Sequence, residues 1–226
     1  GTLVNWNGKP LATTVLSGTQ ATAVVPAALL SAQGTAKVTL TNPAPGGGPS
    51  APLPFVIAPA AATLHTFPAG LQMLAVTEDY ANVGLSGALS DSSHALLVWN
   101  PATAVYETRT DLHPGAAYWT RLSKPTDLLD TGTPAPTSGP FSIALRAGWN
   151  MIGDPFPTAV ALSSLTVRDA IGTQGTFHQA VSGGVVSGTL YAYPAGSTQY
   201  QKVGQDGNLT PFDGDWIYAF RACTLL

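Results

Sequence analysis

The sequence is divided into short hydrophobic runs, which turn-forming residues separate about every 8–12 positions. The 226 residues include 24 glycines and 19 prolines, residues that helix interiors and sheet ladders rarely accept. Helical periodicity is nearly absent, and residues 26–32, which begin with a proline, amount to one turn at most. Short β-branched and aromatic runs of this kind predict an all-β fold made of sandwiches or barrels.

Charged residues make up only 9% of the chain, whereas about a quarter is usual in a soluble domain. Small polar residues must therefore coat most of the surface, or another molecule must cover it. The net charge of -3 provides no basic field for nucleic acid or an anionic membrane. No run of about 18 apolar residues is present, so we expect no membrane span. The composition favours an extracellular location, at a bacterial cell surface.

Residues 1–59 form a first block. The stretches VNWNGKPLATTVLSGTQATAVVPAALL and GTAKVTLTNPAPGGGPSAPLPFVI follow the order of the IPT/TIG family, and the block resembles these immunoglobulin-like domains. The resemblance implies a β-sandwich. Family members carry a further strand and a glycine-rich stretch before the hairpin of the first stretch, and this sequence has neither. We therefore expect an Ig-like sandwich that lacks its first strand.

Residues 60–226 contain an internal duplication, with copies at about 65–123 and 141–222 and an exposed Pro/Thr/Gly-rich linker at 124–140. Matched residues recur at equal intervals in the two copies: Met73 with Met151, Trp99 with Tyr193, Tyr106 with Tyr200, and Trp119 with Trp216. Each copy supplies about four strands, too few to bury both faces alone. We expect the copies to pack into one pseudo-symmetric sandwich or barrel.

The second copy contains the stretch GWNMIGDPF, which resembles repeats near the ends of large bacterial secreted and surface proteins. The resemblance implies an extracellular module and no known chemistry. The matched aromatic side chains either anchor the core or, where they are exposed, stack on sugars. Four residues are candidates for sugar stacking: Trp99, Tyr106, Tyr191 and Tyr193.

No catalytic constellation is visible, so we expect a protein that is not an enzyme and holds no cofactor. The four histidines share no metal-ligand spacing. The stretch LLDTGTP at 128–134 resembles the catalytic turn of aspartic proteases, but that chemistry needs two such turns and the sequence has one. We interpret it as a turn in the linker.

Oxygen-rich and hydroxyl-rich stretches suggest modification or ion binding. Three aspartates of DGNLTPFDGD are candidate calcium ligands, with a polar hairpin as the alternative because EF-hand spacing is absent: Asp206, Asp213 and Asp215. We expect no other metal site. Four residues are candidates for glycosylation, the first in an N-linked sequon and the others O-linked: Asn208, Thr131, Thr133 and Thr137. Cys223 is the only cysteine, which excludes an internal disulfide.

The incomplete first sandwich leads to the main functional hypothesis. Its missing strand leaves unpaired backbone groups, for which three explanations compete: the strand lies upstream in a longer precursor, the domain is open and adapted, or another subunit donates a strand. The apolar stretch DWIYAFRACTLL is the candidate donor, and head-to-tail exchange builds an open filament. We expect the assembly interface at seven residues: Leu3, Val4, Trp6, Phe220, Cys223, Leu225 and Leu226.

This hypothesis describes a structural subunit of a surface filament, whose partner is a second copy of itself. The alternative is a carbohydrate-binding or adhesion module of a larger secreted protein, with glycans as partners. Exposed Trp and Tyr rings would favour the alternative, whereas buried rings would remove its basis.

Overall fold

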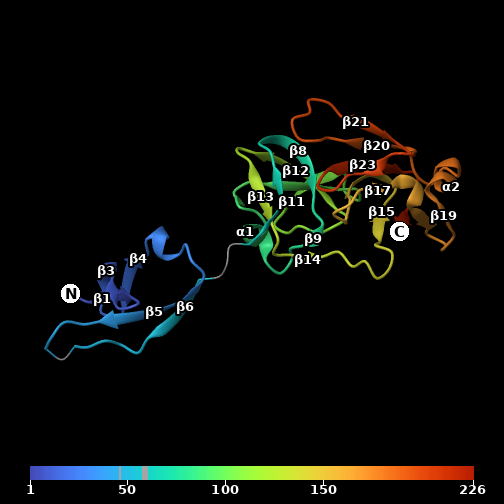
Figure 1. Cartoon of the computed structure of the whole chain (residues 1–226). Coiled ribbons are helices and arrows are strands. Elements are labelled where there is room, and N and C mark those ends of the chain that lie inside the picture. The colour runs from blue at the N-terminus through green and yellow to red at the C-terminus, as the bar shows by residue number, and fades with distance from the viewer. Residues whose placement is uncertain (46, 58–60) are drawn as a thin grey trace. The chain divides into compact units, whose positions relative to one another are not determined.

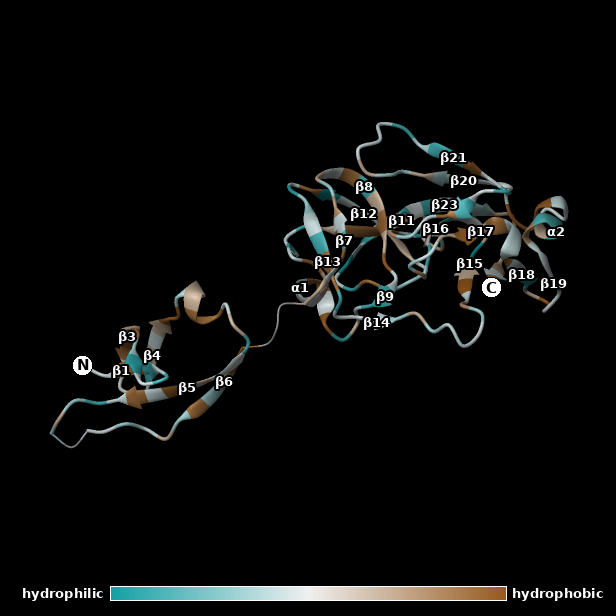
Figure 2. Cartoon of the chain, in the orientation of Figure 1, coloured by the Kyte–Doolittle hydropathy of each residue, from teal (hydrophilic) through white to brown (hydrophobic). Residues whose placement is uncertain are grey.

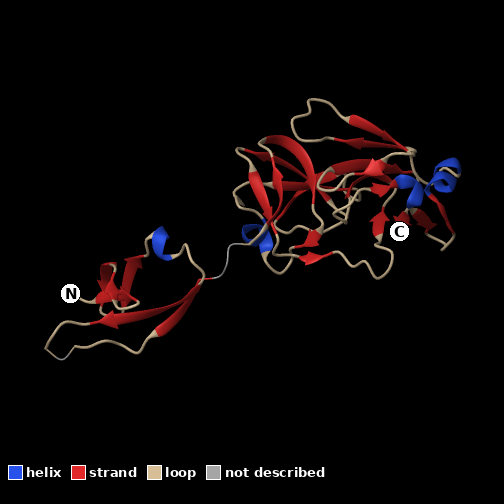
Figure 3. Ribbon diagram, in the orientation of Figure 1, coloured by secondary structure: helices blue, strands red, loops and turns tan. Residues whose placement is uncertain are grey.

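The computed structural model describes three stretches of the chain: residues 1–45, 47–57 and 61–226. The chain divides into two compact units, Gly1–Ala60 and Ala61–Leu226 (Figure 1). The prediction of an all-β fold is confirmed, because antiparallel strands dominate both units and the described helices are short (Figure 3). The helical turn predicted at 26–32 occurs as the 3-10 helix η1 (Ala27–Leu29). In the described part of the chain, no helix is long and apolar enough to cross a membrane.

The N-terminal unit consists of two small antiparallel sheets. Its strands are β1 (Leu3–Trp6), β2 (Lys9–Pro10), β3 (Ala12–Ser17), β4 (Gln20–Val24), β5 (Gly34–Thr41) and β6 (Leu53–Ile57). One sheet has the order β2-β1-β5-β6, and the other is the hairpin β3-β4. Asn7 and Gly8 form the first hairpin turn with positive φ angles of 49° and 81°, a backbone conformation that asparagine and glycine tolerate best.

The hydrophobic core of the N-terminal unit is small. Among its described residues, three hydrophobic side chains are fully buried: Trp6, Leu11 and Ala36. The strands of both sheets also carry other apolar residues (Figure 2), and several of these are exposed, such as Val24 and Val56 at 71% and 70%. A unit that buries so few side chains gains little stability from the hydrophobic effect.

Each repeat of the C-terminal unit forms a four-stranded antiparallel sheet. The strands of the first are β8 (Gly70–Ala75), β10 (Leu96–Asn100), β11 (Val105–Arg109) and β12 (Ala117–Leu122). The strands of the second are β16 (Gly148–Gly153), β20 (Thr189–Ala192), β21 (Gln201–Gly204) and β23 (Gly214–Ala219). The orders β8-β12-β10-β11 and β16-β23-β20-β21 are equivalent, so the unit is built from two internal repeats.

The strand register is also the same in both sheets. The equivalent cross-strand pairs are Met73 with Trp119 and Leu97 with Trp119 in the first sheet, and Met151 with Trp216 and Tyr191 with Trp216 in the second. Residues that correspond by sequence interval therefore occupy equivalent positions in the two sheets.

Two backbone hydrogen bonds, at equivalent positions of the two repeats, connect one repeat to the other. Gly153 N–H donates to the Gly115 carbonyl over 3.2 Å, and Ala75 N–H donates to the Phe212 carbonyl over 2.9 Å. A Cβ atom at Gly153 would collide with the Cβ of Ala75. The junction therefore needs glycine at this position, because the two strands approach too closely for a side chain.

The remaining elements enclose a separate hydrophobic core in each repeat. Three short strand pairs are β7 (Thr63–Phe67) with β13 (Thr126–Leu129), β9 (Glu78–Asp79) with β14 (Thr133–Pro134), and β17 (Val160–Ala161) with β22 (Asn208–Leu209). A last sheet has the order β15-β24-β18-β19, formed by β15 (Ile143–Leu145), β24 (Cys223–Leu225), β18 (Thr166–Asp169) and β19 (Gln174–Thr176). The helices are α1 (Gly84–Ala88), η2 (Leu162–Ser164) and α2 (Phe177–Ser182).

The segment 124–140 differs from the exposed linker that its composition suggests. It contains β13 and β14, and Leu128 is fully buried in the core of the first repeat. The stretch LLDTGTP therefore belongs to two strands and the turn between them. Asp130 and Gly132 mark that turn, but they do not reveal that the flanking residues pair with β7 and β9.

Candidate functional site

A pocket lined entirely by aromatic side chains lies where the two repeats meet. We call it the aromatic pocket; it encloses about 360 Å³ and is formed by Trp99, Tyr106, Trp149, Tyr191, Tyr200 and Trp216. Small-molecule pockets in proteins measure roughly 300–1,000 Å³ and are lined mainly by hydrophobic and aromatic groups. The aromatic pocket has the size and the lining of such a site.

Strand alternation places these rings on the sheet faces opposite the cores of the two repeats, where Trp216 forms a further hydrophobic cluster with Met73 and Met151. In β23, Ile217 and Ala219 are buried in the core of the second repeat, so Trp216 takes the opposite face. In the first repeat, Trp99 of β10 lies directly opposite Tyr106 of β11, and their ring centroids are 5.2 Å apart. The pocket thus combines side chains from both sheets.

The rings form a buried floor with exposed walls. Trp216 is 8% exposed, whereas Tyr106, Trp149 and Tyr200 are 47%, 41% and 49% exposed. Trp99 and Trp149 stand almost perpendicular to Trp216, at interplanar angles of 73° and 83° and centroid distances of 5.9 and 6.2 Å. Edge-to-face contacts of this kind stabilise the rings in place and leave ring faces open to a ligand.

The polar groups of the pocket are tyrosine hydroxyls and indole N–H groups, and none of the six side chains carries a charge at neutral pH. Burial raises the pKa of Tyr106 above its usual value, so its hydroxyl stays protonated well above neutral pH. The pocket therefore offers apolar ring faces together with a few neutral hydrogen-bonding groups.

Three of the four residues predicted to stack on sugars line the pocket: Trp99, Tyr106 and Tyr191. Tyr193 lies beside it, 5.0 Å from the ring of Trp119 and 5.4 Å from that of Tyr200. The sequence prediction omitted three lining residues: Trp149, Tyr200 and Trp216. The duplication could have indicated two of them, because Tyr200 and Trp216 are the repeat partners of Tyr106 and Trp119. Trp149 has no aromatic partner in the first repeat.

The C-terminal segment is not a free strand, and this part of the assembly prediction needs correction. β24 is paired on one edge with β15 and on the other with β18, and Cys223 and Leu225 are buried in the core of the second repeat. Leu226 exchanges two backbone hydrogen bonds with Thr166, of 2.8 and 3.0 Å. These residues have no unpaired edge to donate. Phe220 alone among the predicted donors is largely exposed.

The predicted acceptor residues lie in β1, which is an interior strand between β2 and β5. Trp6 is 4% exposed and packs on Phe55, so the prediction that it forms an assembly surface is also corrected. Val4 is half-buried and Leu3 is exposed. The unpaired edges of the described N-terminal sheets instead belong to β2, β3, β4 and β6.

The candidate calcium ligands do not come together. Asp206 pairs with His178 over 2.8 Å, away from the other two. Asp215 is 2% exposed, and its Oδ1 atom has no hydrogen-bond partner among the described residues. Burial, together with the nearby carboxylates of Asp213 and Asp154, raises the pKa of Asp215 to about 7. No group of three metal-ligating side chains is found in the described part of the chain.

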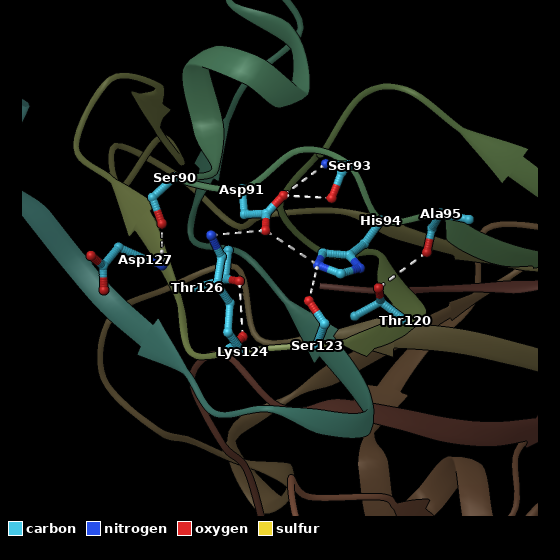
Figure 4. A network of polar contacts seen from close by, with 10 residues as sticks. All are labelled: Ser90, Asp91, Ser93, His94, Ala95, Thr120, Ser123, Lys124, Thr126 and Asp127. Atoms are coloured by element: carbon cyan, nitrogen blue, oxygen red, sulfur yellow. Dashed lines mark hydrogen bonds and ion pairs between the residues drawn. The ribbon is translucent and has the colours of Figure 1, made fainter.

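A polar network in the first repeat brings Asp91, His94 and Ser123 together (Figure 4). The Asp91 carboxylate and the Ser123 hydroxyl lie 3.6 and 3.5 Å from the same histidine nitrogen, Nε2. A Ser-His-Asp relay needs the carboxylate on one ring nitrogen and the hydroxyl on the other. This network therefore joins the segments around β10 and β13 and lacks the geometry of a catalytic triad.

The glycosylation candidates lie at different places on the surface. Asn208, Thr133 and Thr137 are exposed. Thr131 is half-buried, and its hydroxyl donates to the Gly87 carbonyl over 2.7 Å. Steric access therefore favours the first three over Thr131.

No family model matches the chain, and neither a curated protein nor a solved structure is significantly similar to it.

Proposed function

We propose that the C-terminal unit is a non-enzymatic carbohydrate-binding module of an extracellular protein. The observation that carries the proposal is the aromatic pocket, in which six Trp and Tyr rings from both repeats surround about 360 Å³. The low content of charged residues, 9%, agrees with an extracellular module whose surface is coated by small polar residues.

The chemistry of a sugar ring matches this lining. A pyranose with equatorial substituents presents a face of C–H groups, and the electron-rich face of an aromatic ring attracts them. The hydroxyls at the sugar rim need hydrogen bonds, which tyrosine hydroxyls and indole N–H groups provide. Trp216 at the floor and Trp99 and Trp149 at the walls offer ring faces in several directions.

A polyproline peptide is the main competing ligand, because it also docks in aromatic grooves. Such a peptide is an extended helix of about 3.1 Å per residue that lies along an open groove. A pocket with a buried floor and walls close to perpendicular instead favours a ligand that seats one compact ring between the walls, as a sugar residue does.

The test is a glycan array followed by calorimetric titration of the sugars that bind. Trp99→Ala should weaken binding at least about tenfold, since it removes a wall of the pocket. Ile171→Ala is the matched control, because Ile171 is 88% exposed outside the pocket. Binding of a proline-rich peptide without binding of any sugar would contradict the proposal.

We infer a second candidate function, self-assembly by strand complementation, for the N-terminal unit. The exposed apolar residues of β4 and β6 support it, because both strands have an unpaired edge in the described sheets. The incoming strand cannot be β24, which has no free edge. The filament hypothesis therefore needs another donor segment.

Electron microscopy and sedimentation test this second candidate. The wild-type protein should form polymers as its concentration rises, and Val56→Lys should keep it monomeric by placing a charge at the edge of β6. Ile171→Lys is the control for added charge. A wild-type protein that stays monomeric at every concentration would rule out this candidate and leave the carbohydrate proposal untouched.

A further inference from the structure

The aromatic surface continues beyond the pocket along β23 and the residue that follows it, Phe220. Trp216, Tyr218 and Phe220 are alternate residues and therefore share one face of the chain. The ring of Tyr218 lies 5.2 Å from that of Trp149, at the pocket wall, and 5.2 Å from that of Phe220. Phe220 is 60% exposed. We call Tyr218 and Phe220 the aromatic extension.

The backbone beneath the aromatic extension is held firmly. The Tyr218 carbonyl accepts a hydrogen bond of 2.8 Å from Ser187 N–H, and Phe220 N–H donates one of 2.9 Å to the Val185 carbonyl. Val185 itself is buried in the core of the second repeat. The backbone that carries the two rings is thus fixed before a ligand arrives, which reduces the entropy lost on binding.

The extension lengthens the aromatic surface well past one sugar ring. Residues 216 to 220 span about 13 Å, at roughly 3.3 Å per residue. The pocket and the extension together present Trp, Tyr and Phe side chains without a charged group among them. A surface of this composition complements a long, uncharged ligand whose successive rings each meet an aromatic side chain.

We propose that the aromatic pocket and the aromatic extension bind one uncharged polysaccharide chain across several successive sugar residues. This inference rests on the proposed function, because the pocket supplies the first stacking position. One sugar residue occupies the pocket between Trp99 and Trp149, and the following residues lie over Tyr218 and Phe220. The module therefore recognises a polymer rather than a free sugar.

Titration calorimetry tests the inference with uncharged cello-, chito- and manno-oligosaccharides, each used as the disaccharide and the hexasaccharide. The hexasaccharide of the matching series should bind about tenfold more tightly than its disaccharide. Phe220→Ala should reduce the hexasaccharide affinity close to that of the disaccharide and leave the disaccharide affinity unchanged. Trp99→Ala should weaken both, and Ile171→Ala neither.

Two outcomes overturn the inference while the proposed function stands. One is equal affinity of disaccharide and hexasaccharide, and the other is an unchanged hexasaccharide affinity in Phe220→Ala. If Phe220→Ala instead dissolves a polymer seen by sedimentation and leaves sugar affinity intact, Phe220 is a protein contact and the inference is wrong. Binding of none of these oligosaccharides, nor of any array glycan, overturns both proposals together.

Discussion

The two repeats of the C-terminal unit share a framework but differ on their outer faces. Trp149 and Tyr191 line the aromatic pocket, whereas the equivalent positions of the first repeat, in the same strand registers, hold Leu71 and Leu97. The methionines and tryptophans that pair across the sheets are kept in both. The difference teaches that the duplication supplies the scaffold and the first repeat supplies Trp99 and Tyr106, while further aromatic residues of the second repeat complete the aromatic pocket.

A second difference lies inside the repeats. The first repeat buries Tyr118, whose hydroxyl accepts a hydrogen bond of 2.9 Å from His113 N–H. The equivalent residue of the second repeat is Asp215, whose Oδ1 atom has no partner among the described residues. The hydrogen-bonded hydroxyl of Tyr118 in the first repeat thus corresponds to a buried carboxyl oxygen without a partner in the second. The free energy of unfolding should therefore depend on pH mainly through the second repeat.

The largest effect is expected at the junction that joins the repeats. Gly153→Ala places a Cβ atom against Ala75, and separating the strands should cost about 2–4 kcal/mol of unfolding free energy. Denaturant unfolding measures the change. Gly204→Ala is the matched control, because a Cβ at Gly204 meets no atom within 4 Å. Equal stability of the two variants would show that the repeats are not held together as described.

The next effect concerns Asp215. Its folded-state pKa of about 7 lies above the unfolded value of 3.8, so the folded protein binds more protons between these values. The free energy of unfolding should therefore fall as pH rises from about 4 to about 7, by up to about 4 kcal/mol. Asp154, whose pKa burial raises to about 6, contributes to the same fall, so Asp215→Asn should remove the part that Asp215 contributes and be the more stable protein at pH ~8.

Unfolding by denaturant across this pH range provides the measurement. Asp206→Asn is the control, because its carboxylate is 81% exposed and pairs only with His178. Stability of the wild-type protein that is constant or rises between pH ~4 and ~7 would contradict the assignment of a buried, protonated Asp215.

A smaller effect is expected when the second repeat is made to resemble the first. Trp149→Leu introduces the residue found at the equivalent position of the first repeat, Leu71. Sugar affinity should fall about tenfold, because one wall of the pocket is lost. The unfolding free energy should change by less than about 1 kcal/mol, since Trp149 is already 41% exposed. A large loss of unfolding free energy without a loss of sugar affinity would show that Trp149 stabilises the fold and does not bind the ligand.

The sequence predicted the scaffold better than the site, for physical reasons. Alternation and equal intervals between Met and Trp residues are local signals, so the strands and the duplication could be recognised. The pairing of β24 with β15 and β18 is long-range, and an apolar strand looks the same whether its partner is internal or foreign. Asp215 lies opposite Ile152 in the pairing of β16 with β23, and these two residues are also distant in the sequence, so the burial of Asp215 could not be predicted from its neighbours.

The smallest effect separates ring stacking from hydrogen bonding. Tyr106→Phe keeps the ring and removes one neutral hydroxyl, so affinity should fall only about threefold. Because the pKa of Tyr106 is raised by burial, wild-type affinity should also stay constant up to pH ~9. Titration calorimetry at neutral and alkaline pH checks both expectations. A loss as large as that of Trp99→Ala would make hydrogen bonding, rather than stacking, the main source of affinity.

The most direct test of the central claim is an NMR titration of the five indole N–H signals with the oligosaccharide that binds best. The signals of Trp99, Trp149 and Trp216 should shift together along one saturating curve, because these rings line the aromatic pocket. The signal of Trp6, buried in the N-terminal unit, should stay in place. Saturable binding that leaves the three pocket signals unmoved would contradict the account.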